Sequence, residues 1–136
     1  MRRNLLTAFL VGAGLLLATT AVLAHHSQSA EFDRTKPIEF TGVVKAIEWT
    51  SPHGYTQVET KGPDGKVLVY RVEFTAANQL FRAGWRRDSV KIGTAVKVKG
   101  TRSRSEASMN VSGEMTMPDG KVAFRGPGPE AAPEAP

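Results

Sequence analysis

A tight turn between two alternating segments, Gly62-Pro63-Asp64-Gly65, is the feature that most limits how this chain can fold. Proline fixes one backbone dihedral of a turn, and glycine or aspartate supplies a left-handed residue at little cost. Residues 55–61 before the turn alternate between two faces, and residues 67–75 after it are rich in Val, Tyr and Phe. The pattern predicts an antiparallel hairpin in the middle of the chain.

Further strands are expected on both sides of this hairpin. Residues 38–49 are expected to form one long strand that bends near Gly42, because a glycine inside a strand pattern often marks a bulge. A short helix is expected over 76–82, with Thr75 as its cap and Gly84 at its end. The later strands are expected over 92–100, 107–117 and 121–124.

This order of elements predicts a mainly β domain: a small OB-like β-barrel of five to six strands, with one short helix between strands 3 and 4. The fourth-strand pattern Gly93-x-x-Val96-x-Val98-x-Gly100 favours it, with valines facing inward and lysines outward. A flat sandwich is the alternative, because periodicity alone does not separate the two architectures.

The first 24 residues are typical of a signal peptide. Met1-Arg2-Arg3 is a short positive region, residues 5–23 are mainly apolar, and Val22-x-Ala24 is a small-residue cleavage site. We therefore expect a periplasmic or secreted protein with no stable membrane span after cleavage. The expected parts are a signal peptide over 1–24, an N-terminal arm over 25–36, the β domain over 37–125 and a disordered Pro/Ala/Gly tail over 126–136.

Charge and cysteine content exclude several classes of protein. The formal net charge is +5, and cleavage would remove Arg2 and Arg3 without removing an acid, so the remaining chain is only mildly basic. Because its basic residues are spread along the chain, we do not expect it to bind nucleic acid. The absence of cysteine excludes disulfides, a lipid-anchored lipoprotein and a thiolate metal site.

Several short motifs resemble a family of small exported bacterial proteins classified as a domain of unknown function. The resemblance extends over roughly 25–124 and implies export but no particular chemistry. One departure is Ser51, where the family commonly has Asn. The motifs are His25-His26-Ser27, Phe32-Asp33, Gly42-x-Val44, Trp49-x-x-Pro52-His53, Gly84-Trp85 and Gly93-x-x-Val96-x-Val98-x-Gly100.

The three histidines suggest a copper site. Cleavage after Ala24 would make His25 the N-terminus, which offers a metal its amine and its imidazole, as in histidine-brace proteins. Both groups deprotonate near neutrality, with unperturbed pKa values of about 7.7–8.0 and 6.5. His53 is expected to supply a second imidazole, and His26 is a supporting or alternative ligand. Copper(II) is the first choice for nitrogen ligands because it heads the divalent affinity order.

Simpler interpretations stand beside the copper hypothesis. His25 and His26 point to opposite faces in an extended chain, and all three histidines can be ordinary polar residues. The protein would then be a structural or adaptor module that docks a periplasmic protein partner and binds no metal. An enzyme is less expected, because the sequence contains no nucleophile elbow, zinc-protease motif or phosphate loop.

Three other groups of residues are best explained by packing or solvation. The methionines Met109, Met115 and Met117 are expected to pack in or beside the core rather than to bind copper(I). The aromatic residues Trp49, Tyr55, Tyr70 and Trp85 are expected in the core or at its rim rather than in a stacking platform. A basic cluster of Arg82, Arg86, Arg87 and Lys91 is expected to be a solvated face, with an anionic ligand or a membrane surface as the alternative.

Overall fold

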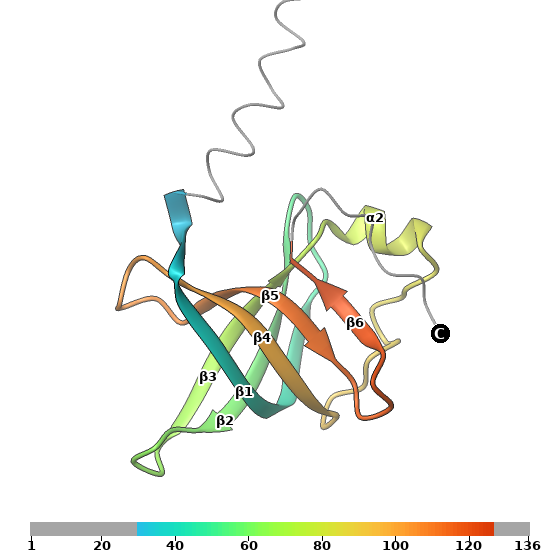
Figure 1. Cartoon of the computed structure of the whole chain (residues 1–136). Helices are drawn as coiled ribbons and strands as arrows, with labels where there is room; N and C mark the ends of the chain where they lie inside the picture. Colours follow the sequence, from blue (N-terminus) through green and yellow to red (C-terminus); the bar gives the residue numbers. More distant parts are fainter. Residues whose placement is uncertain (1–29, 127–136) are drawn as a thin grey trace, which may run out of the picture. The chain divides into compact units, whose positions relative to one another are not determined.

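The protein is described from a computed structural model that covers residues 30–126. Six strands and one short helix follow one another from Phe32 onward (Figure 1). Their bounds are β1 Phe32–Glu48, β2 Gly54–Lys61, β3 Val67–Phe74, α2 Ala77–Arg82, β4 Ala95–Ser103, β5 Asn110–Thr116 and β6 Val122–Arg125. The mainly β class and the single short helix between strands 3 and 4 are confirmed.

The strands form one sheet whose pairing closes into a ring. The order is β3-β2-β1-β4-β5-β6 with antiparallel neighbours, and a parallel pairing between β3 and β5 joins the two sides. This pairing matches the connectivity expected for an OB-like domain and differs from that of two stacked sheets. The last strand, β6, extends the sheet beyond β5.

The hairpin between β2 and β3 fixes the register of the central strands. Gly65 has a positive φ of 77°, and its N–H donates to the Gly62 carbonyl at 2.9 Å, as the turn motif predicts. Lys61 then pairs with Val67, and the register runs without a shift to the pairing of Gly54 with Phe74. This uninterrupted register decides which residues of β3 lie beside the loop that precedes β2.

The bend in β1 lies close to the expected glycine. A side chain at Gly42 would place its Cβ 2.5 Å from the Glu59 carbonyl oxygen, so only glycine allows β2 to approach this closely. The register of β1 against β2 then shifts between Val44 and Ala46, which is a β-bulge. β1 pairs with β4 over 37–43 and, on both sides of the bulge, with β2 over 43–48, so it is the strand that connects the two halves of the ring.

The core fills the interior of the ring with aliphatic and aromatic side chains. Val96 and Val98 of β4 are buried while Lys97 and Lys99 are exposed, which confirms the inward and outward alternation. Trp85 is fully buried, and its ring centroid lies 5.3 Å from that of Phe124. The other buried core residues include Val44, Val58, Val72, Phe74, Leu80, Val111 and Met115.

Two strand boundaries differ from the sequence-based expectation. The first strand begins at Phe32 rather than Ile38, because Phe32 is buried and pairs with Ser103 while the polar residues after it stay on the surface. The fourth strand begins at Ala95 rather than Ile92, because Gly93 has a φ of 90° and its N–H donates to the Val44 carbonyl in a turn. Ile92 is therefore 61% exposed instead of lying in the core.

Part of the expected domain organisation lies outside the described residues. This part comprises the signal peptide over 1–24, residues 25–29 of the N-terminal arm, and the tail over 127–136. Within residues 30–126, no helix has the length and hydropathy that a bilayer span requires.

Candidate functional site

His53 ends the loop between β1 and β2 and contacts a buried acid of β3. Its Nδ1–H donates to Oε1 of Glu73. The loop is fixed from two sides: the Thr50 hydroxyl donates to the His53 carbonyl at 2.7 Å, and the Ala77 N–H donates to the Thr50 carbonyl at 3.1 Å. The imidazole is thus held at a defined place on the ring.

Glu73 is an unusual residue for its position. It lies between the core residues Val72 and Phe74, and its side chain is only 1% exposed. The register places it opposite Tyr55 of β2 on one side and opposite Ser112 of β5 on the other. Burying a carboxylate costs free energy unless partners stabilise it, so the contact with His53 helps to stabilise the fold.

The contact also determines which imidazole nitrogen remains available. With Nδ1–H donating to Glu73, Nε2 of His53 is the second nitrogen, and the side chain as a whole is 34% exposed. Histidines that bind metals commonly donate their other ring N–H to a carboxylate, which fixes the tautomer and raises the basicity of the ligating nitrogen. The His53–Glu73 pair has this arrangement.

A second polar cluster is formed by residues of β1, β2 and β3. The Arg71 guanidinium binds both carboxylate oxygens of Glu48, with Nη2 to Oε2 at 2.6 Å and Nε to Oε1 at 3.3 Å. The Gln57 amide donates to Oε1 of Glu48 at 2.9 Å, and the Arg71 guanidinium lies 4.1 Å from the ring centroid of Tyr55. The bonds from Arg71 first, and then that from Gln57, lower the pKa of Glu48 below its ordinary value.

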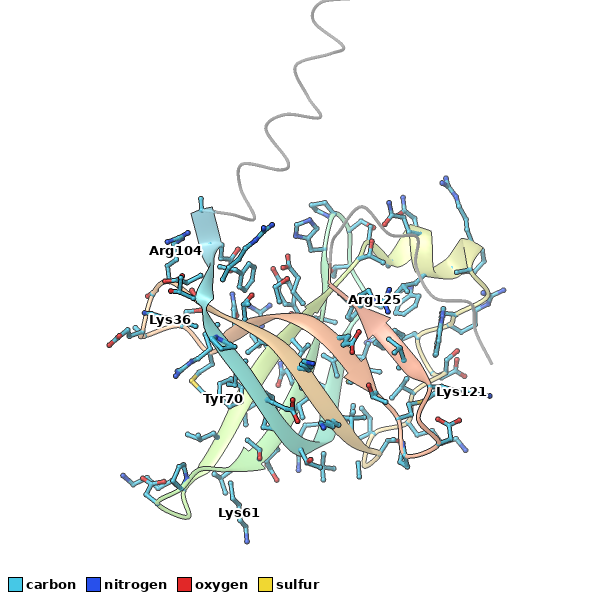
Figure 2. The ribbon with its side chains drawn as sticks, viewed as in Figure 1. Lys36, Lys61, Tyr70, Arg104, Lys121 and Arg125 are labelled. Carbon is cyan, nitrogen blue, oxygen red and sulfur yellow. The ribbon has the colours of Figure 1, made fainter. Side chains whose placement is uncertain are left out.

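This polar surface continues onto the last two strands. Arg125 of β6, labelled in Figure 2, lies 3.5 Å from Oε2 of Glu114 on β5. The strands next to the His53 loop therefore carry three acids and two guanidinium groups. The acids are Glu48, Glu73 and Glu114, and the guanidinium groups are those of Arg71 and Arg125. The three carboxylates outnumber the two guanidinium groups by one in this part of the structure.

Comparison with known proteins gives a family. Residues 13–112 match a family of unknown function, DUF6152. The chain belongs to this family. No curated protein and no solved structure shows significant similarity to it. The expected membership of a family without an assigned function is confirmed.

The DUF6152 chain has one of its three candidate ligands in the described region. His53 lies in its loop as expected, whereas His25 and His26 fall outside residues 30–126. Across that described range, no group of three or more His, Asp or Glu side chains is arranged to hold a metal ion. A complete site would therefore need donors in addition to His53 and Glu73.

The remaining candidates of the sequence pack as ordinary side chains. Met115 is fully buried, and Met109 and Met117 pack against the same core. Tyr70 and Trp85 are buried, so they do not form an exposed platform with Trp49, which packs near Phe74 and Phe124 at centroid distances of 5.9 and 6.0 Å.

Glu73 is the residue that the sequence-based analysis missed. Its sequence neighbours are apolar, and it is 20 positions away from its partner His53 in the chain. The hairpin turn indicates this contact, because it sets Lys61 opposite Val67. The register then places Tyr55 opposite Glu73, and His53 precedes Tyr55 by two residues.

Proposed function

We propose that this DUF6152 protein is exported and acts as a small periplasmic binding protein that holds copper through His25 and His53. The single observation that carries the proposal is the bond from the His53 Nδ1–H to the buried carboxylate of Glu73. It supports a ligating role because it directs Nε2 away from the acid that orients the ring. The apolar leader and its small-residue cleavage site support export.

The proposed ligand set joins two parts of the chain. Cleavage after Ala24 would give His25 a free amine, so that its amine and imidazole bind one copper ion together. The Nε2 atom of His53 supplies a third nitrogen, and His26 is a supporting or alternative ligand. Glu73 does not bind the metal in this proposal, because its Oε1 faces Nδ1 of His53. Three nitrogen ligands suit copper(II), which leads the divalent metals in affinity.

A copper(II) titration, followed by electron paramagnetic resonance, tests this proposal. The protein that begins at His25 is compared with a version that carries one additional N-terminal alanine. We expect tight one-to-one binding by the first and a large loss in the second, because the extra residue converts the His25 amine into an amide. His53→Ala should then lower the affinity of the first protein and alter the nitrogen coupling in its spectrum. Equal, weak binding by both proteins would exclude the copper site.

The alternative is an adaptor module that docks a periplasmic protein partner, and one surface of the ring favours it. Val43 and Val69 are each 38% exposed and lie on either side of Glu59 across β1, β2 and β3, and Val67 is 60% exposed on the hairpin. Docking would be supported if the wild type and Phe81→Ser both bind an exported partner and Val43→Ser/Val69→Ser does not. Equal recovery with both variants would exclude this surface.

A further inference from the structure

The segment from α2 to β4 combines exposed cations with exposed apolar side chains. We infer that this segment, with Arg82, Arg86, Arg87 and Lys91 together with Phe81 and Ile92, binds the surface of an anionic phospholipid bilayer. We call these six residues the basic surface. The inference is independent of copper binding, since none of the six residues is a ligand of the proposed copper site.

The charges of the basic surface are not neutralised within the described residues. Most cations of the strands lie within 4.0 Å of an acid, as Lys97 does with Glu39 and Arg125 with Glu114. By contrast, none of the four cations of the basic surface forms an ion pair with any residue in 30–126. The only acid in this segment is Asp88. The positive potential of the segment is therefore directed at the solvent.

Two large apolar side chains flank these cations. Phe81 at the end of α2 is 55% exposed, and Ile92 before β4 is 61% exposed. The Arg86 guanidinium lies 4.1 Å from the Phe81 ring centroid and donates to the carbonyls of Phe81 and Trp85 at 3.2 and 2.8 Å. These bonds hold Arg86 against Phe81, so charge and apolar surface are presented together.

A shallow hollow connects the segment with β1. It has a volume of about 530 Å³, and its apolar lining residues include Ile47, Val90 and Ile92. Its charged lining residues are Arg87, Lys91 and Asp88, together with Lys45, which pairs with Glu59 at 3.5 Å. A phosphate group beside a hydrocarbon chain matches both the charged and the apolar residues of this lining.

Charge complementarity favours the bilayer surface as the occupant. Anionic lipids attract basic side chains at the membrane surface, and the attraction falls off within a Debye length. Apolar side chains next to such cations enter the boundary between headgroups and acyl chains. The competing occupants are an acidic protein and this chain's own last ten residues, which contain Glu130 and Glu134.

Vesicle sedimentation tests the inference with the purified chain, whose N-terminus is first determined by mass spectrometry. The vesicles contain equal parts of phosphatidylglycerol and phosphatidylcholine, and vesicles of phosphatidylcholine alone serve as the reference. We expect binding to the anionic vesicles that weakens as salt is added. The charge-reversal variant Arg82→Glu/Arg87→Glu/Lys91→Glu should lower the partition coefficient at least about tenfold.

A matched control separates the basic surface from net charge. Arg34→Glu/Lys61→Glu/Lys99→Glu makes the same change in net charge at exposed cations that also form no ion pair within 30–126. Lys61 lies at the β2–β3 hairpin, at the end of the sheet opposite to α2 (Figures 1 and 2). This control should retain most of the lipid binding, and Phe81→Ser should lower binding more than Val67→Ser does.

Three results would overturn the inference. They are equal losses in the two charge-reversal variants, equal binding to anionic and neutral vesicles, and lipid binding that becomes measurable only when residues 127–136 are removed. The last result would identify the chain's own acidic tail as the occupant of the basic surface. Copper binding in the same preparations reports on the other proposal separately, because the basic surface contains none of the proposed ligands.

Discussion

The Nδ1–H of His53 donates to Oε1 of Glu73, an acid whose side chain is 1% exposed although it alternates along β3 with the core residues Val72 and Phe74. This pair connects the β1–β2 loop to β3. It therefore stabilises the loop, and it also sets the orientation of the only histidine within residues 30–126. The two roles are separable by experiment, because stability is measured without metal.

Removal of the imidazole should destabilise the fold. We expect His53→Ala to lower the free energy of unfolding by about 1–3 kcal/mol, because the buried carboxylate loses a hydrogen bond that water does not readily replace. In the double variant His53→Ala/Glu73→Gln, part of this loss should be recovered, since the remaining side chain carries no charge. Urea unfolding of the four proteins in a double-mutant cycle, without added metal, measures the coupling. Additive losses would show that the pair contributes no coupling energy.

Trp85 should be one of the most sensitive positions in the core. It is fully buried after α2, its backbone N–H donates to the Leu80 carbonyl at 3.0 Å, and its ring packs on Phe124. Trp85→Ala should cost about 3–5 kcal/mol of unfolding free energy, as expected for a large aromatic in a close-packed interior. The neighbouring Phe81→Ala, at a 55% exposed side chain, should change stability by less than about 0.5 kcal/mol. Circular dichroism during denaturation distinguishes the two outcomes.

Local patterns were sufficient to predict the order of the elements. The turn at Gly62–Gly65 and the alternation of Val96 and Val98 depend on neighbours in the chain, and the structure confirms both. The sequence predicts the fourth strand over 92–100, three residues before β4 begins, because Ile92 continues the apolar pattern across a turn at Gly93. The start of β1 at Phe32 was missed because the polar residues that follow it lie on the surface of the sheet.

The candidate site depends on contacts that local patterns do not contain. His53 was identified from its residue type, but Glu73 acquires its meaning only from burial among three neighbouring strands. The pair of Arg71 with Glu48 was missed for the same reason, since 23 positions separate the two residues. A register derived from the hairpin turn would have placed Gln57 opposite Arg71, next to these partners.

The paired strands β4 and β5 should tolerate no side chain at two facing glycines. Gly100 pairs with Gly113, and a Cβ on Gly113 would lie 2.2 Å from the Lys99 carbonyl oxygen. On Gly100, a Cβ would lie 2.3 Å from the Ser112 carbonyl oxygen. Gly113→Ala and Gly100→Ala should therefore each destabilise the fold by about 1–3 kcal/mol, because the backbones must separate. Thermal unfolding, with exposed Lys99→Ala as the control, tests this expectation; a loss no larger than that of the control would contradict it.

The ion pair of Glu48 with Arg71 should make stability depend on acid pH. The hydrogen bonds from Arg71 and Gln57 lower the pKa of Glu48 in the folded chain below its ordinary value of 4.5. A carboxyl group whose pKa is lower in the folded than in the unfolded chain stabilises the fold above its unfolded pKa. That contribution is lost as the pH falls through the folded pKa. The stabilisation should be at most about 1 kcal/mol, because both side chains are partly exposed.

Glu48→Gln should remove this acid-dependent contribution. The stability difference between the wild type and Glu48→Gln is expected to be largest above pH 4.5 and to shrink as the pH falls below it. Urea unfolding at a series of pH values measures the difference, and Arg71→Met should reduce it because the main donor is lost. The control is Glu106→Gln, at a side chain that is 91% exposed. If the difference for Glu48→Gln stayed constant across this range, Glu48 would not be stabilised as a carboxylate, and the bonds from Arg71 would have no electrostatic consequence in solution.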